Sequence, residues 1–398
     1  MPDFKLISAD CHISEPPEAF ARVAKEYGDR APKVVENPQG YGPGLWIIGE
    51  GLTPMRSAYF GMGYVIEKPK GRGMSIYANG EHFKKKVQDY LKNFRYEDYP
   101  QGWEPSAYLG ALDQDGIEAA LIFPSWARYN YVQSDAKYQR SIFRSYNEWV
   151  LDFAAYSPKR LFPVPMLSIL DIDLAIADMK EYIKRGCKTV MIPTTIDGSG
   201  YYEDMYEPLW QTAEDLGIPL TVHSGSSQGR AMVSHGDSAR KGDPRTYIIH
   251  KPVTNAAGAQ AAWEFVSNLI FSGVFDRHPK LKVACAEFEV GEAASVVHSI
   301  DYNYGRVSML DPEKTINKRW PSEYFFENIY FSFEDDPALV RATGIYGENN
   351  FIWGSDFPHH MTTYPLSPQA LDASFEGIDP NVARKLARDN AIKLYQLF

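Results

Sequence analysis

The sequence predicts one (β/α)8 barrel of the TIM type, and three observations support this prediction. Eight short β-rich runs recur along the 398 residues, and most are continuously apolar, as expected for parallel strands covered on both faces. Segments with a helical pattern separate the runs, and this ordered alternation favours a closed parallel barrel over an open sheet. The chain exceeds an average domain, but barrels attain this length when loops are inserted. We therefore expect residues 1–398 to form a single domain.

The predicted strands begin with KLISAD near the start and finish with FIWGSDF near the end. In chain order they cover residues 5–10, 119–125, 161–167, 188–194, 219–225, 282–288, 328–333 and 351–357.

The predicted helices are recognised mainly by their ends. Residues 171–185 and 205–216 each stop at a glycine, the favoured residue just past a helix. Residues 138–156 carry a helix-length pattern that ends before a Ser-Pro pair. A last helix begins with Asp-Pro at 379–380, an N-cap residue followed by proline at the first helical position.

Two long connections interrupt the alternation, and both follow the carboxyl end of a predicted strand. Residues 33–110 are rich in glycine, tyrosine, phenylalanine and tryptophan, and residues 226–262 follow the fifth strand. Barrel enzymes have their active sites at this end of the strands. Long irregular insertions are usually functional or disordered, and the aromatic content disfavours disorder. We interpret 33–110 as an inserted lid or substrate-binding segment, not an independent domain.

Composition and charge limit the compartment and the partners. Hydrophobic residues make up 44% and charged residues 23% of the chain, ordinary values for a soluble globular protein. A net charge of −10 argues against nucleic-acid or anionic-membrane partners, and no apolar run approaches the roughly 18 residues of a membrane span. The first residues lack a signal-peptide pattern, and the three cysteines show no CxxC spacing. We expect a cytoplasmic protein with reduced thiols and a small-molecule substrate.

Four residues of metal-ligand type lie at the carboxyl ends of three predicted strands. Asp10 and His12 are two residues apart at the end of the first strand, so they share one face of it. His223 lies at the end of the fifth strand and Asp356 at the end of the eighth. A barrel gathers these ends around one mouth, where the four side chains should meet. Two imidazoles and two carboxylates suit Zn²⁺, Fe²⁺ or Mn²⁺, and we expect a divalent metal here.

Each of these residues also has a structural interpretation. An Asp-x-His pair alone is usually structural, a histidine at a strand end is often a satisfied core residue, and Asp356 can cap the following turn. Their equivalent positions on three strands make a shared metal site the stronger hypothesis. The glycine-rich stretches contain no P-loop and no dinucleotide-binding motif, so no nucleotide cofactor is expected.

Several motifs resemble the amidohydrolase superfamily, and most closely its branch related to aminocarboxymuconate-semialdehyde decarboxylase. The motifs are SADCHISEP, TVHSGS, FDRHPKLKVACAE, FIWGSDFPHHMTTYP and the terminal DNAIKLYQLF, and they span nearly the whole chain except 33–110. The resemblance implies that Asp10, His12, His223 and Asp356 are metal ligands. It also implies that Asp356 exchanges protons and that the protein is a homo-oligomer, a dimer in many relatives.

Two positions depart from the pattern of this branch. The common His-x-His of the first strand is Asp-x-His here, which makes the site more anionic. The decarboxylases of the branch resemble one another in a histidine that ends the sixth strand, where this chain has Glu287 after Ala286. Glu287 is either a salt-bridge or capping residue, or a functional one. A functional Glu287 would be a general acid or base, or a ligand of a second metal about 3.5–4 Å from the first.

Two further histidines are predicted to bind the substrate. His359 and His360 follow Asp356 closely, only one of them can easily face the mouth, and the resemblance favours His359. His250, in the long connection after the fifth strand, is within reach of a substrate, although a solvated loop position is the simpler alternative.

The primary functional hypothesis is a metal-dependent hydrolase. The metal lowers the pKa of bound water toward ~7 and Asp356 moves the proton. The metal itself, or a partner such as His250 or Glu287, stabilises the developing negative charge. The aromatic insertion favours a hydrophobic, aromatic or cyclic substrate with an amide, C–C, ester or thioester bond. The alternative is a non-oxidative decarboxylase of an aromatic acid, which the missing histidine disfavours. A non-catalytic relative is disfavoured because all four ligand-type residues are present.

Overall fold

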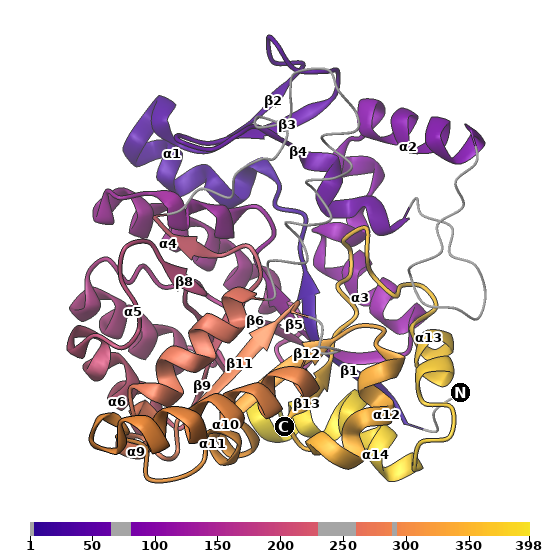
Figure 1. Ribbon diagram of the computed structural model, residues 1–398. Helices are drawn as coiled ribbons and strands as arrows, with labels where there is room; N and C mark the ends of the chain where they lie inside the picture. The colour runs from indigo at the N-terminus through magenta and orange to yellow at the C-terminus, as the bar shows by residue number, and fades with distance from the viewer. Residues whose placement is uncertain (1–3, 65–80, 230–259, 289–292) are drawn as a thin grey trace.

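The computed structural model describes residues 4–64, 81–229, 260–288 and 293–398 (Figure 1). His250, predicted to bind the substrate, lies outside these residues.

The eight parallel strands predicted from the sequence form the barrel, and each falls on one of the predicted runs. Three of them pair in one sheet: β1 (Leu6–His12), β5 (Ile117–Phe123) and β6 (Leu161–Pro163). Five pair in a second sheet, in the order β13 (Phe351–Trp353), β12 (Ile329–Phe333), β11 (Lys282–Ala286), β9 (Pro219–His223) and β7 (Val190–Met191).

Contacts beyond the regular pairing join the two sheets into a ring. A parallel bridge connects Met166, just after β6, to Met191 of β7. On the opposite side, the backbone N–H of Asp356 donates to the carbonyl of Asp10 at 2.9 Å, and the N–H of His12 donates to the carbonyl of Phe357 at 2.6 Å. The barrel is therefore closed, and its closure brings the ends of β1 and β13 together.

The close approach of β1 and β13 requires glycine at position 354. A Cβ atom at Gly354 would lie 2.4 Å from the Cβ of Asp10, which is far inside contact distance. Any side chain there would displace Asp10 from the strand end, so this glycine serves packing next to the candidate site.

Helices cover the outside of the barrel, as Figure 1 shows. α4 (Ala136–Ala154) begins at the N-cap Asp135, whose side chain accepts from the backbone N–H groups of residues 137 and 138. α6 (Glu207–Leu216) ends at Gly217, which is left-handed as predicted. Further helices are α5 (Ile172–Lys184), α9 (Val274–Arg277), α10 (Ala293–Leu310), α11 (Pro321–Asn328), α12 (Pro337–Tyr346), α13 (Ser367–Ser374), α14 (Pro380–Arg384) and α15 (Asn390–Tyr395), and residues 260–271 are also helical.

The insertion after β1 has its own secondary structure and a small hydrophobic cluster. After α1 (Ala21–Tyr27), an antiparallel sheet is followed by two helices: β2 (Lys33–Glu36), β3 (Leu45–Ile48), β4 (Met55–Arg56), α2 (Glu81–Asn93) and α3 (Pro105–Gln114). Figure 1 shows the sheet beyond the carboxyl end of β1. The hydroxyl of Ser14 donates to the carbonyl of Phe60 at 2.7 Å, and the Phe60 ring lies 5.9 Å from that of His359. The insertion thus contacts the mouth of the barrel.

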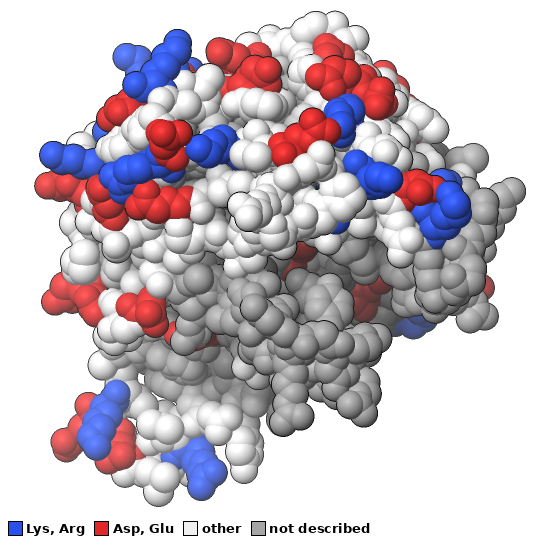
Figure 2. Space-filling view, turned by 90° about the horizontal axis from the view of Figure 1, so that it is seen from above, with Lys and Arg blue, Asp and Glu red and all other residues white. Residues whose placement is uncertain are grey.

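The described helices and one face of the described surface bear on possible membrane and nucleic-acid partners. Within the described ranges, no helix is both long and apolar enough to cross a bilayer. Seen from the top of Figure 1, acidic and basic side chains lie close to one another along the edges of the described surface (Figure 2). Such mixing produces no extended field of one sign.

Candidate metal centre

The four side chains predicted as metal ligands converge at the mouth of the barrel, and all are buried. The Nε2 atoms of His12 and His223 lie 3.0 Å apart. Oδ1 of Asp10 lies 3.5 Å from each of these nitrogens, and Oδ1 of Asp356 lies 3.3 Å from Nε2 of His12. Ligand atoms about 2.1 Å from one shared metal have separations of roughly 3–3.5 Å. The spacing therefore suits a single metal ion.

The hydrogen bonds of the two histidines determine which nitrogen faces the centre. Nδ1 of His12 lies 3.2 Å from the carbonyl oxygen of Pro124, and Nδ1 of His223 lies 2.9 Å from that of Ser224. A carbonyl oxygen only accepts, so both Nδ1 atoms carry hydrogen, and in a neutral ring the Nε2 atom then presents a lone pair. Burial lowers the pKa of His223, but the negative charge of Asp10 outweighs it and raises this pKa above its usual value. The two Nε2 atoms, 3.0 Å apart, therefore need a cation between them, either a proton or a metal ion. The donor set fits a divalent metal.

The carboxylate oxygens lead to the same conclusion. Among the side chains that the structure describes, Oδ1 of Asp10 and Oδ1 of Asp356 are buried and accept no hydrogen bond. A buried carboxylate oxygen that accepts no hydrogen bond is costly, even with histidine nitrogens close to it. Burial, and then the negative charges of Glu287 and Asp10, hold the pKa of Asp356 well above its usual range. A cation at the centre would offset these effects.

Glu287 directly follows β11 and lies on the far side of the His223 ring from the centre. Its Oε2 atom is 3.4 Å from Nδ1 of His223 and accepts from the hydroxyl of Ser224 at 2.5 Å. Two groups of possible ligands occur in the described chain, Asp10 with His12 and His223, and His12 with Asp356 and His359; Glu287 belongs to neither. Glu287 thus lies beside the nitrogen of His223 that faces away from the centre, and its role as a ligand of a second metal stays a prediction.

The backbone at Glu287 and Asp356 is unusual. Both residues have positive φ angles, 57° and 54°, in the left-handed region that non-glycine residues rarely adopt. Such conformations cost about 1–3 kcal/mol and are concentrated at functional sites. The two turns that follow β11 and β13 therefore store strain while directing carboxylates to the mouth.

His359 lies inside the cluster and not at its edge. Its Nδ1 atom is 2.9 Å from Oδ1 of Asp356, its Nε2 atom is 2.8 Å from the hydroxyl of Ser125, and its ring stacks on His12 with a centroid separation of 3.8 Å. Burial, and then the positive charge of Arg128, lower the pKa of His359 to about 3, so the ring is neutral. Contact with substrate remains a prediction for His359. Its observed partners are Asp356 and Ser125.

Several residues at the site were not identified from the sequence. Ser125 and Arg128 follow β5 closely. Side chains just past the carboxyl end of a barrel strand face the mouth, and this rule, which led to His223 and Asp356, applies equally to them. Glu15 lies in the loop that follows β1. Its buried carboxylate accepts from the backbone N–H groups of residues 125, 126 and 127, at 2.8, 2.7 and 3.0 Å. Glu15 thereby holds the loop that carries Ser125.

Replacing Glu15 by alanine should lower the free energy of unfolding by about 3 kcal/mol or more. Three buried N–H groups would lose their acceptor, and each unsatisfied group costs about 1–3 kcal/mol. Glu15→Gln keeps one acceptor oxygen and should cost less. Urea unfolding measures both, and exposed Glu18→Ala is the control, with an expected change within about 0.5 kcal/mol. A cost below about 1 kcal/mol for Glu15→Ala would contradict this role.

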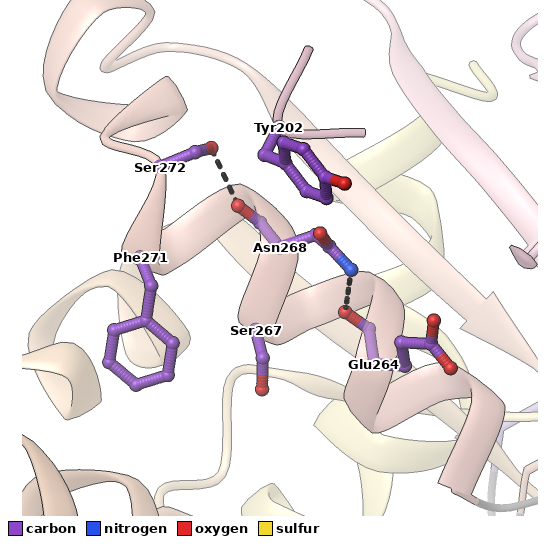
Figure 3. Close-up of a pocket in the computed structure, with 6 residues that line it drawn as sticks. All are labelled: Tyr202, Glu264, Ser267, Asn268, Phe271 and Ser272. Atoms are coloured by element: carbon purple, nitrogen blue, oxygen red, sulfur yellow. Dashed lines mark hydrogen bonds between the residues drawn. The ribbon is translucent and has the colours of Figure 1, made fainter. Parts of the chain in front are cut away.

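A surface pocket of about 380 Å³ lies elsewhere (Figure 3). Its lining residues are Tyr202, Glu264, Ser267, Asn268, Phe271 and Ser272. Within it, the amide of Asn268 donates to the carbonyl of Glu264 at 2.8 Å, and the hydroxyl of Ser272 donates to the carbonyl of Asn268 at 2.6 Å. These side chains are satisfied by their own helical stretch, and the pocket contains none of the clustered ligands. It does not compete with the barrel mouth as the candidate site.

Comparison with known proteins defines the class. A family model described as amidohydrolase matches residues 9–397, so the chain belongs to the amidohydrolase family, and the resemblance seen in the motifs is confirmed.

Among curated proteins, 2-amino-3-carboxymuconate-6-semialdehyde decarboxylase of Dictyostelium discoideum is 20% identical over 312 residues, covering 74% of this chain and 77% of the relative. An amidohydrolase structure from Mycobacterium avium subsp. paratuberculosis has a TM-score of 0.75 at 19% identity and covers 99% of this chain and 100% of its own. A dihydroxybenzoic acid decarboxylase from Polaromonas, solved with manganese and the inhibitor 2-nitroresorcinol, has a TM-score of 0.61 at 20% identity, covering 79% of this chain and 94% of its own. These similarities confirm the predicted barrel.

Proposed function

We propose that this chain is a metal-dependent, non-oxidative decarboxylase of an aromatic acid. The observation that carries the proposal is the convergence at the barrel mouth of two histidine Nε2 atoms and two buried carboxylate oxygens that accept no hydrogen bond. The names of the relatives support the reaction, since two of those described above are decarboxylases. Manganese in the Polaromonas relative supports Mn²⁺ as the metal, with Zn²⁺ and Fe²⁺ as alternatives. The order of the two hypotheses drawn from the sequence is thereby reversed.

In this proposal the clustered residues bind the metal, and Asp356 also moves a proton. His12 and His223 would hold the metal through Nε2, and Asp10 and Asp356 through Oδ1. A metal bound there would supply positive charge that draws electrons from a substrate carboxylate and a neighbouring hydroxyl. The bond between the ring carbon and the carboxylate breaks, its electron pair stays on the carbon, and CO2 leaves. Asp356 then hands a proton to that carbon.

Neighbouring residues support these tasks. His359 lies 2.9 Å from Asp356 and orients the carboxyl group that moves the proton. Ser125 contacts the other ring nitrogen of His359 and holds the ring in place. Phe60, from the insertion 33–110, supplies an apolar wall beside His359, consistent with an aromatic substrate and with a lid. We also propose that residues 1–398 form a single domain, which limited proteolysis tests. We propose that the protein is a homodimer, which analytical sedimentation tests.

Hydrolysis is the second candidate function. Asp10 and Glu287 make the site more anionic than one built with histidines at both positions. An anionic site repels a carboxylate substrate and favours a neutral amide, ester or thioester. This charge argument is the specific observation in favour of hydrolysis.

One assay separates the two functions. Manganese-loaded protein is incubated with a panel of hydroxylated aromatic acids and, separately, with aromatic amides, esters and thioesters. We expect CO2 release from a member of the first panel, and loss of that release after chelation. Hydrolysis of the neutral compounds without CO2 release would establish the second candidate, and inactivity toward both panels with Mn²⁺, Zn²⁺ and Fe²⁺ would overturn the proposal.

A further inference from the structure

Arg128 lies behind both candidate metal histidines, in the 3-10 helix η6 (Ala127–Val132) that follows β5. Its side chain is only 6% exposed. A buried guanidinium is unfavourable unless its N–H groups are paired. The groups that pair with the guanidinium therefore indicate what Arg128 does.

Three backbone carbonyls hold the guanidinium. Its Nη1 atom donates to the carbonyl of Pro124 at 3.0 Å and also to that of Ser125. Its Nε atom donates to the carbonyl of Ser224 at 3.2 Å. The remaining nitrogen, Nη2, faces Glu287, with 3.8 Å to Oε2. Arg128 thus connects the loop after β5 to the loop after β9.

Two of these carbonyls are the same oxygens that orient the metal histidines. The Pro124 oxygen also accepts from Nδ1 of His12, at 3.2 Å. The Ser224 oxygen also accepts from Nδ1 of His223, at 2.9 Å. One planar guanidinium therefore joins the acceptor of one ring to the acceptor of the other.

We propose that Arg128 is a positioning residue that sets the two histidine ligands relative to each other, and thereby the affinity of the centre for its metal. The inference rests on the proposed metal site of His12 and His223. The N–H groups of a guanidinium point in fixed directions within one plane, so they fix the distance between the two carbonyls. Partners of this kind, one step removed from the metal, typically change metal affinity 10–100-fold when removed.

A competing role is charge compensation alone. The positive charge of Arg128 lies near Glu287 and acts on Asp356 and His359 as well. Lysine would preserve that charge, but a single ammonium cannot reproduce the planar fork that bonds both carbonyls. Arg128→Lys therefore separates positioning from charge.

The test measures metal binding, not turnover. Protein stripped by chelation is titrated with Mn²⁺, and its Co²⁺ complex is examined by visible absorption, which reports ligand geometry. We expect Arg128→Lys and Arg128→Met to raise the metal Kd at least 10-fold and to change the Co²⁺ spectrum. Arg144→Met is the matched control, because Arg144 pairs with Asp178 and Glu181 and contacts no residue of the cluster in the described structure. Its Kd should equal that of the unmodified protein.

A wild-type Kd and Co²⁺ spectrum in Arg128→Lys would overturn the inference, and this variant decides the matter even where Arg128→Met does not fold. His12→Ala separates this failure from failure of the proposed site. If His12→Ala loses the metal while Arg128→Lys keeps it, only the role of Arg128 is wrong. Unchanged binding in His12→Ala would instead refute the metal site and the inference with it.

Discussion

Asp356→Asn should lower kcat by about 10³-fold or more while the protein remains folded. The substitution replaces a carboxyl group, which gives its proton to the ring carbon and is an anionic ligand once the proton has left, with a neutral amide that can do neither. Proton transfer by a positioned side chain is worth about 10²–10⁴-fold. Asparagine has nearly the same shape and tolerates the left-handed backbone of φ 54°, so the turn after β13 should be unaffected. Steady-state CO2 release measures the effect, alongside circular dichroism and metal analysis.

Asp113→Asn is the matched control for this experiment. Asp113 is an exposed residue paired with Arg160, away from the cluster, and its loss should leave kcat unchanged. A kcat in Asp356→Asn above about a tenth of the normal value would return Asp356 to the structural role of capping its turn.

Removal of the metal should abolish activity and lower the melting temperature by several degrees. A ligand that binds only the folded protein stabilises it by about 4 kcal/mol at a concentration 1,000 times its Kd. Without the metal, no divalent charge offsets the two facing Nε2 atoms or the buried Oδ1 atoms of Asp10 and Asp356, which accept no hydrogen bond. Thermal unfolding of chelated protein, with and without added Mn²⁺, measures the shift, and activity should return with the metal.

His223→Ala provides the comparison, since its melting temperature should no longer respond to metal. No response of the unmodified protein to Mn²⁺, Zn²⁺ or Fe²⁺ would contradict the proposed centre. Elemental analysis adds a second criterion. One ion per chain is expected, whereas two would restore Glu287 as a ligand of a second metal.

Residue patterns alone did not identify the reaction that the relatives favour. Asp10 and Glu287, in place of histidines, led to hydrolysis as the first hypothesis. The relatives favour decarboxylation, and the structure places Glu287 beside Nδ1 of His223, on the side of the ring away from the centre. Residue type at one position does not specify which side of a neighbouring ring the side chain will occupy.

The barrel and the four ligand-type residues were determined by the sequence itself. Apolar runs and helical patterns alternate along the chain, and strand order alone predicts that Asp10, His12, His223 and Asp356 share one mouth, because a closed parallel sheet brings all carboxyl ends to one side. Each strand and helix is recognised from its own short stretch of sequence, and this local pattern occurs eight times along the chain.

Only the tertiary structure decided how the rings of His12 and His223 are oriented and which groups orient them. Pro124 and Ser224 lie in different loops, and their carbonyl oxygens meet the Nδ1 atoms and Arg128 only after the barrel closes. Backbone carbonyls are present at every residue, so no residue pattern distinguishes the two that act here. Their role arises from distances between loops remote in sequence, which are defined when β5 and β9 take their places in the folded barrel.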